Sequence, residues 1–291
     1  MAIIKALFSV LLFTFPVASA QPSARTPTVF LTHFYVALDQ PSYDALRTSA
    51  QVAALAAVKE SHTNAGGREW TGFYILGRQT YMEFFGAQAL PNGMRPGDSG
   101  LALTVEESGG VEKIAARLRT VFGERIEVET TPRDTPVGTI PWFRSTDIKS
   151  DEPQALSTWF METDPAYLAA MHPGARIEHP LSREQGLSWT YLADHPFDNV
   201  VGLTLALTPS DSTQLATELE LAGWKIHREG QEFAAIGPQI KLIVVLADAR
   251  TGIREVELRL RHSVPKQTIV AGSAKLLLEG KTGRLTVWAS N

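Results

Sequence analysis

The sequence predicts an α+β protein built from repeated βαβββ units. Three stretches of the chain share one order of segments: an apolar strand, an amphipathic helix, then two or three further strands. The helices carry apolar residues at helical spacing, and the flanking strands are rich in Val, Ile, Phe and Tyr. Of the 291 residues, 44% are hydrophobic and 20% are charged, which is enough apolar material for a packed core.

Residues 1–20 are a predicted signal peptide. Lys5 precedes the apolar run "ALFSVLLFTFPVA", and the small-residue sequence "ASA" ends just before Gln21. The run is shorter than the roughly 20 apolar residues of a spanning helix, so a retained membrane anchor is the less favoured alternative. We therefore expect a mature chain that begins near Gln21 and is exported, to the periplasm or the extracellular medium, with no stable membrane anchor.

The first unit begins at Thr28. The strand "TVFLTHFYVALD" is followed by a predicted helix over 42–58, "SYDALRTSAQVAALAAV". The segment "WTGFYILGRQTYMEFFGA", 70–87, then reads as two strands joined at a corner.

A carboxylate, Glu83, stands in the second of these strands, where burial should be greatest. Strand alternation puts it on one face with Tyr81, and puts His33 and Tyr35 together on one face of the first strand. The apolar neighbours of these residues then face the helix. We expect His33 and Glu83 to point into a cavity from neighbouring strands, with Tyr35, Tyr74 and Tyr81 lining it.

The second and third units repeat the order. The second has a strand over 99–107, a helix over 109–123 and three strands, at 125–132, 141–148 and 156–164. The third has a strand and helix within 199–230, followed by strands at 232–237, 239–248 and 253–260. We therefore predict a paired domain over 28–171, a linker over 172–197 and a third module over 198–291.

The predicted linker contains two motifs of lower weight. "HPGARIEHP" carries His172 and His179 among prolines and a glycine, which already explain the segment as a loop. "GLSWTYLADHPFDN" could form a surface loop or a lid, with Trp189 and Tyr191 either stacking on a ligand or packing in the core.

The repeated βαβββ order resembles the glyoxalase-like fold of the vicinal oxygen chelate superfamily. The phrases "LTHFYVALD", "TGFYILGRQTYMEFFGA" and "STWFMETDPAYL" resemble an uncharacterised bacterial family related to the glyoxalase and bleomycin-resistance proteins. The resemblance covers about 28–171, and the third unit matches only by the order of its elements. It implies two curved sheets that face each other around a cavity, often with a divalent metal.

The same resemblance implies metal ligands on the first and last strands of each unit, usually His and Glu. His33 and Glu83 stand at such positions, and Glu162 is the third candidate because "FME" at 160–162 echoes "YME" at 81–83. The expected ion is Zn, Fe, Ni or Mn. The pattern departs from the family in one respect: aligning the first strands pairs His33 with Gly100 and Gly202, so no second histidine is found.

Three functions remain open at this point. The first is a metal-assisted isomerase, lyase or dioxygenase that acts on a small molecule, and the second is a metal-free protein that binds or sequesters one. The third is a structural or interaction module, in which side chains fill the cavity and the third unit provides a binding edge. A structural interpretation of Glu83 and Glu162 also remains, in which they are hydrogen-bonded or paired with residues such as Arg78 and Arg144. Without a metal, Glu83 could still act as a base if burial raises its pKa.

Composition excludes several classes of function and leaves the oligomeric state open. The chain has no cysteine, so disulfides and thiol chemistry are ruled out. With 27 basic and 31 acidic residues the net charge is −4, which argues against nucleic acid as a partner. A small molecule is the expected partner.

Overall fold

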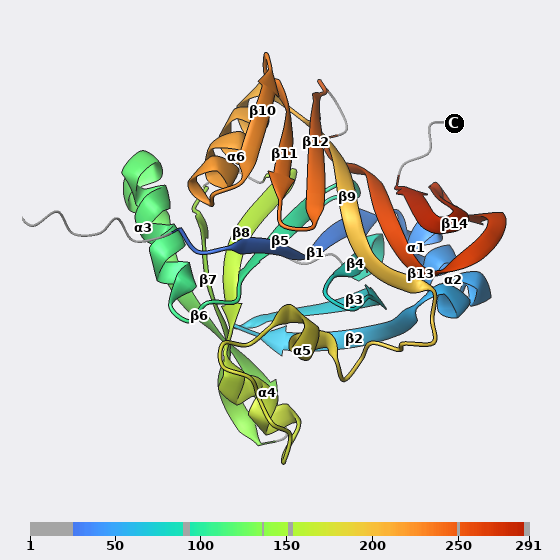
Figure 1. Cartoon of the computed structure of the whole chain (residues 1–291), viewed down its shortest axis with the longest axis horizontal. Helices are drawn as coiled ribbons and strands as arrows, with labels where there is room; N and C mark the ends of the chain where they lie inside the picture. Colours follow the sequence, from blue (N-terminus) through green and yellow to red (C-terminus); the bar gives the residue numbers. More distant parts are fainter. Residues whose placement is uncertain (1–25, 90–93, 136, 151–153, 249–250, 288–291) are drawn as a thin grey trace, which may run out of the picture.

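The computed structural model describes residues 26–89, 94–135, 137–150, 154–248 and 251–287. It shows an α+β protein made mostly of strands, in which an eight-stranded closed barrel lies beside a six-stranded sheet. Figure 1 shows the barrel in the centre of the molecule, with the second sheet along its upper and right-hand sides. The predicted signal peptide lies outside the described residues.

Residues 29–86 form one half of the barrel. Its elements, in chain order, are β1 (Val29–Leu38), α1 (Gln40–Arg47), α2 (Ala50–Leu55), β2 (Ala57–Ala65), β3 (Arg68–Leu76) and β4 (Tyr81–Gly86). Asp39 caps α1 and Ser49 caps α2, each through a side-chain oxygen that accepts a backbone N–H. The single helix predicted over 42–58 is therefore two short helices. Ser49 caps the start of a second helix, and the residues after 56 belong to β2.

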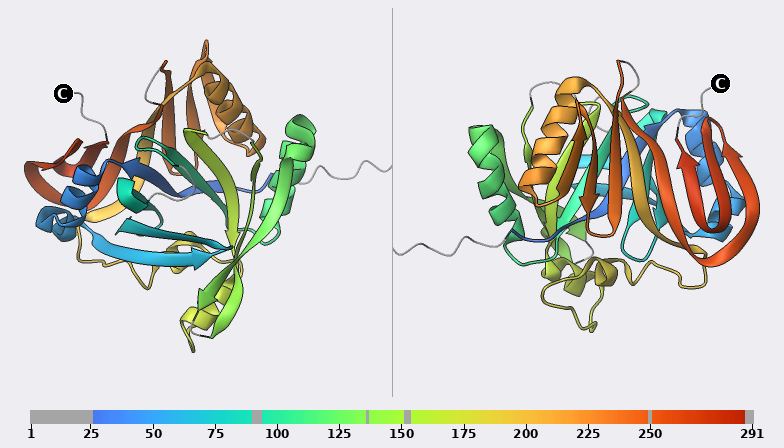
Figure 2. Two further views of the ribbon diagram at one scale, coloured as in Figure 1. Left: turned by 180° about the vertical axis from the view of Figure 1, so that it is seen from behind. Right: turned by 45° about the horizontal axis from the view of Figure 1, so that its top comes forward.

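Residues 99–163 form the other half. After the short turn η1 (Ala87–Ala89) come β5 (Ser99–Val105), α3 (Gly110–Phe122), η2 (Gly123–Arg125), β6 (Ile126–Thr135), β7 (Gly138–Ile148) and β8 (Leu156–Thr163). Buried residues of α3 recur at helical spacing, which places Val111, Ile114, Ala115 and Leu118 against the sheet. Figure 2 shows α3 on the outside of the barrel and the long β6–β7 hairpin extending beyond it.

The two halves pair in the same manner. In each half the first strand lies parallel to the last, β1 beside β4 and β5 beside β8. The halves join where β1 and β5 run antiparallel, and the ring closes where Ala65 of β2 pairs with Arg133 of β6. The barrel therefore brings the first and last strands of both halves around one interior.

The chain after the barrel contributes three helices and the six strands of the second sheet. They are α4 (Pro165–Met171), α5 (Arg183–Leu187), β9 (Phe197–Leu207), α6 (Pro209–Leu221), β10 (Lys225–Glu229), β11 (Glu232–Gly237), β12 (Ile240–Leu246), β13 (Gly252–Ala271) and β14 (Ala274–Thr286). The strand order is β10-β11-β12-β9-β13-β14, with β12 parallel and β13 antiparallel to β9. These pairings repeat those that β4 and β5 make with β1, and the sheet then ends at β14 without closing.

Barrel and sheet share one hydrophobic core. The buried cluster runs from Val29 of β1 to Val287 at the end of the described chain. Hydrogen bonds also join the barrel to the second sheet: Asn199 Oδ1 accepts the Thr80 N–H at 3.1 Å, and Trp224 Nε1 donates to the Val29 carbonyl at 3.1 Å. The two sheets are therefore held as one body.

Three further elements differ from the sequence prediction or add to it. β2 was not expected, β13 extends to 20 residues rather than ending at 260, and β14 follows it. The predicted linker at 172–197 contains the short helix α5. None of the helices in the described part of the chain combines the length and the apolar character needed to cross a membrane.

Candidate functional site

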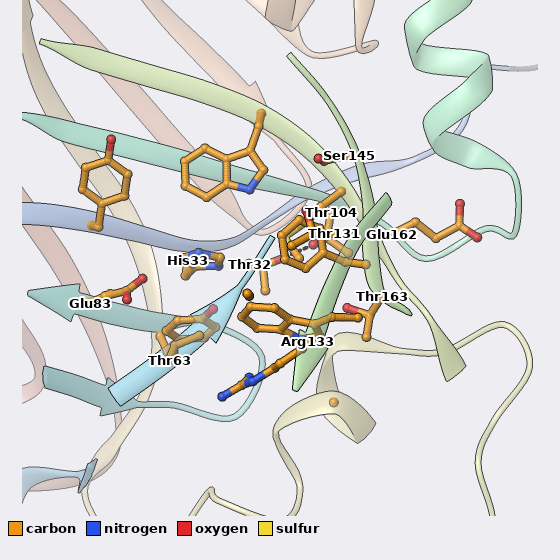
Figure 3. A pocket seen from close by; sticks show the side chains of 18 of the residues that line it. Thr32, His33, Thr63, Glu83, Thr104, Thr131, Arg133, Ser145, Glu162 and Thr163 are labelled. Carbon is orange, nitrogen blue, oxygen red and sulfur yellow. Dashed lines mark hydrogen bonds between the residues drawn. The ribbon is translucent and has the colours of Figure 1, made fainter. Parts of the chain in front are cut away.

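The barrel encloses a cavity of about 1030 Å³, at the upper end of the range usual for small-molecule sites. Strands of both halves contribute to its wall, and residues of the segment after α4 border it as well. Figure 3 shows His33 and Glu83 on one side of the cavity and Arg133 and Thr131 on the other.

His33 reaches the cavity next to an irregularity in β1. The pairing with β5 shifts between Leu31 and His33, so Thr32 is a bulge residue, and both Thr32 and His33 line the cavity. The imidazole stacks on Tyr81 with ring centroids 4.2 Å apart, and its Nδ1 is buried with no hydrogen-bond partner among the described residues. Burial lowers the pKa of His33 to about 3, so the ring is neutral at physiological pH.

Glu83 comes from β4, beside β1, and is only 7% exposed. Tyr74 of β3 donates a hydrogen bond of 2.6 Å to its Oε1. Desolvation raises the pKa of Glu83 to about 7, while hydrogen bonds from Tyr74 and Trp70 and the charge of Arg133 oppose the rise. The carboxyl therefore titrates close to neutral pH. A Cβ at Gly72 would lie 2.8 Å from Glu83 Oε1, so a glycine makes room for this pair.

Aromatic rings line the cavity where the two halves of the barrel meet. Tyr35 packs on Trp159 at 5.9 Å, and the edge of Trp159 meets His33 at 5.5 Å. A Cβ at Gly100 would lie 2.3 Å from the Tyr35 ring and 2.8 Å from Trp159. Gly100 is the position that the sequence pairs with His33, so the space that a second histidine would need is filled by Tyr35 and Trp159.

A basic corner lies where β2 meets β6. The Arg133 guanidinium sits 4.3 Å over the ring of Trp142, and its Nη1 donates to the Tyr167 hydroxyl at 2.9 Å. Trp142 in turn lies nearly parallel to Trp70 of the opposite half, with centroids 6.4 Å apart.

The segment after α4 is fastened to the barrel by Arg183. Its side chain, buried in the structure, pairs with Glu106 at 3.2 Å and donates to the Leu31 carbonyl at 2.7 Å. Leu187 and Thr190 of the same segment border the cavity. Of the lid candidates, Trp189 stacks on His172 at 4.1 Å, and the Tyr191 hydroxyl accepts a hydrogen bond from Arg261 at 3.0 Å.

The structure does not bring Glu162 to His33 and Glu83. Its carboxylate accepts the N–H groups of Gly109 and Gly110 at 3.0 and 3.1 Å, at the start of α3, and Figure 3 shows it pointing away from the other two. Glu162 borders the cavity, but its carboxylate is held at the start of α3. Strand alternation puts it on the face of Phe160, a core residue, rather than on the face of Trp159 and Met161.

The donor set therefore does not fit the predicted metal centre. Among the described residues, no three His, Cys, Asp or Glu side chains lie close enough to share an ion. His33 and Glu83 alone are fewer than the three protein ligands of a typical catalytic zinc site. The arginines suggested as structural partners are engaged elsewhere, Arg78 with Asp198 and Arg144 with Glu112.

With this geometry in place, comparison with known proteins identifies the family. The profile of a family of unknown function, DUF5829, matches residues 31–289. The chain belongs to the DUF5829 family. Among curated proteins, none matches the chain significantly.

Two solved structures resemble this DUF5829 protein. A hypothetical protein from Staphylococcus aureus superposes with a TM-score of 0.54 at 12% identity, over 83% of this chain and 95% of that one, which shows a shared fold alone. A xylose isomerase-like TIM barrel/4-hydroxyphenylpyruvate dioxygenase fusion protein gives a TM-score of 0.38 at 11% identity, over 80% of this chain and 36% of that one. The second similarity is too distant to support an inference.

Sequence reasoning missed the basic corner. The strand was expected to end at Pro132, but β6 continues to Thr135, and its pairing with β7 shifts between Thr131 and Pro132. A proline in a strand signals a bulge or an edge, so this signal was present. It could have drawn attention to Arg133, the next residue.

Proposed function

We propose that this protein binds a small organic molecule inside the barrel, in a glyoxalase-like arrangement of two βαβββ halves. The cavity carries the proposal, because it combines a volume of about 1030 Å³ with aromatic walls and a few convergent polar groups. Glu83, Tyr74 and Arg133 are those polar groups. The role is that of a metal-free binding or sequestering protein, since the candidate metal ligands do not converge.

A ligand screen followed by thermal shift tests this proposal. We expect binders to raise the melting temperature of the full chain, because a ligand that binds only the folded state stabilises it. Ser145 lines the cavity from β7, so Ser145→Phe should occupy part of the space and reduce the shift, while Ser145→Ala should retain it. Shifts that survive Ser145→Phe unchanged would contradict binding in this part of the barrel.

A second candidate is a metal-free proton-transfer enzyme. It is favoured by Glu83, whose pKa of about 7 suits a general base at neutral pH. Incubation of carbonyl compounds with the protein in D2O, followed by NMR, would show exchange of the hydrogens next to the carbonyl. The wild-type protein should catalyse the exchange and Glu83→Gln should not. Elemental analysis of the purified protein, together with the same assay after chelation, tests independence from metal.

Export remains part of the proposal and is supported by the sequence alone. Mass spectrometry of periplasmic or extracellular material should find a chain that begins near Gln21. Full-length protein confined to the cytosol would contradict it.

A further inference from the structure

Three basic side chains that line the cavity of this barrel form no salt bridge among the described residues: Arg133, Lys59 and Arg68. Arg133 is the central case. It donates to the Tyr167 hydroxyl and lies over Trp142, but no carboxylate of the described residues is within salt-bridge distance of it. Lys59 and Arg68 also line the cavity and make none of the ion pairs found in the described part of the chain.

The acidic residues that border the same cavity are engaged elsewhere. Glu106 pairs with Arg183, Glu129 pairs with Lys149, and Asp98 accepts the Arg95 N–H. The Glu162 carboxylate accepts two backbone N–H groups at the start of α3. Two further carboxyl groups, Glu83 and Asp147, have pKa values raised by desolvation. None of these groups forms a salt bridge with Arg133, although its charge acts on Glu83 through the cavity.

The surroundings of Arg133 are flat and aromatic. Trp142 and Tyr167 lie under or beside the guanidinium, at 4.3 and 5.6 Å from its centre to their rings, and Trp70 lies nearly parallel to Trp142. A guanidinium held over an indole presents its remaining N–H groups in one plane, the geometry that matches both oxygens of a carboxylate. The adjoining rings offer stacking surface to a planar group.

We propose that the ligand is an aromatic carboxylate, whose anionic group is bound by Arg133 and whose ring packs against Trp70 and Trp142. Tyr74 and Glu83 lie farther along the cavity and hydrogen-bond to a polar substituent at the other end of the ligand. This inference rests on the proposed small-molecule site and names its ligand class.

Matched acid and amide probes test it. Phenylacetate with phenylacetamide, indole-3-acetate with indole-3-acetamide, and 1-naphthoate with 1-naphthamide differ within each pair in the anionic group and little in shape. Binding to the full chain is measured by calorimetry at low salt and pH 7, with acetate as an anion that lacks a ring. We expect at least one acid to bind about 10- to 100-fold more tightly than its amide, the range given by hydrogen bonds to charged groups, and acetate to bind more weakly still.

Variants of Arg133 locate the effect. Arg133→Met removes the charge and should bring the affinity for the acid down to that for the amide, while Arg133→Lys should retain part of the difference. The matched control is Arg125→Met, since Arg125 also stacks on a ring, Phe122, but is exposed and does not line the cavity. Circular dichroism and melting temperature show whether each variant is folded. If Arg133→Met fails to fold, Arg133→Lys and the acid-to-amide ratio of the wild-type protein decide.

The outcomes separate this inference from the function on which it rests. Acids and amides that bind equally well, with Arg133→Met or Arg133→Lys altering neither, would overturn the anionic ligand and leave the binding cavity standing. If no probe binds and the thermal-shift screen also finds no ligand sensitive to Ser145→Phe, both proposals are wrong. Tight binding of acetate alone would overturn the aromatic part.

Discussion

The two halves of the barrel share a backbone pattern but differ in what they place in the cavity. β1 and β4 supply a histidine, two tyrosines and Glu83, whereas β5 and β8 supply residues such as Thr104, Ser157, Trp159 and Met161. In the first half burial shifts the pKa values of His33, Glu83 and the tyrosines beside them, whereas among the cavity residues of the second half it raises the pKa of Asp147. A repeated fold therefore does not repeat its chemistry, because pairing fixes where a side chain points and not which side chain is there.

The largest effect is expected at His33. Its pKa of about 3 lies below the ordinary value of 6.5, so the unfolded state binds a proton that the folded state does not, and stability falls as the pH drops below 6.5. His33→Phe keeps the stack on Tyr81 and removes this penalty, about 3 kcal/mol at pH 4. It also removes a buried nitrogen without a partner, worth about 1 kcal/mol or more at any pH.

Urea unfolding of wild type and His33→Phe at pH 7 and pH 4 measures both contributions. His227→Phe is the control, because His227 is exposed on β10 and lies outside the cavity. A His33→Phe variant less stable than wild type at both pH values would contradict this expectation and mean that the imidazole makes a favourable interaction in the folded protein.

The next largest effect is expected at Glu83, where stability changes with pH in the opposite direction. Its pKa of about 7 lies above the ordinary 4.5, so the folded state holds a proton that the unfolded state releases, and stability falls as the pH rises from 4.5 to 7. Glu83→Gln removes this loss. Its stability relative to wild type should grow from near zero at pH 4.5 to about 3 kcal/mol above pH 7.

Urea unfolding across this pH range checks the Glu83 prediction, with Glu229→Gln on the exposed face of β10 as the control. Between pH 4.5 and 6.5 the contributions of His33 and Glu83 to stability oppose each other in the wild-type protein. When one residue is replaced, the unfolding free energy should therefore vary with pH as the other residue alone dictates. A Glu83→Gln variant that is strongly destabilised at pH 8 would show instead that the carboxylate has a buried ion-pair partner.

A third test concerns the second half directly. Gly100→Ala places a Cβ against Tyr35 and Trp159, so the rings must shift, and overpacking of this kind typically costs about 1–3 kcal/mol. Gly186→Ala is the matched control, since a Cβ there meets nothing within 4 Å. Thermal unfolding of both variants gives the comparison. An unaffected Gly100→Ala protein would show that Tyr35 has room to move, and that the site could accept the side chain its repeat lacks.

Strand alternation in the sequence predicts some of the residues that face the cavity and not others. Period-2 alternation was enough to put His33 and Glu83 on the cavity side of neighbouring strands, because both lie in strands with an apolar opposite face. It failed for Glu162, because the local "FME" match put this residue on the wrong face of its strand. Which face points into the cavity is set by pairing with a strand that is distant in the sequence. Arg133 was missed because a bulge at Pro132 carries its strand further than the pattern suggests.

The smallest effect compares the two glutamates that the sequence treats alike. Glu162 accepts two N–H groups at the start of α3, where a negative charge interacts favourably with the helix dipole. Glu162→Gln retains an oxygen to accept one of them and loses the charge, so we expect a loss of about 0.5–1 kcal/mol in unfolding free energy. Ligand affinity should stay unchanged, whereas Glu83→Gln should alter it. Parallel unfolding and calorimetric titrations of both variants decide, and a loss of ligand affinity in Glu162→Gln would return Glu162 to the site and reopen the three-ligand arrangement.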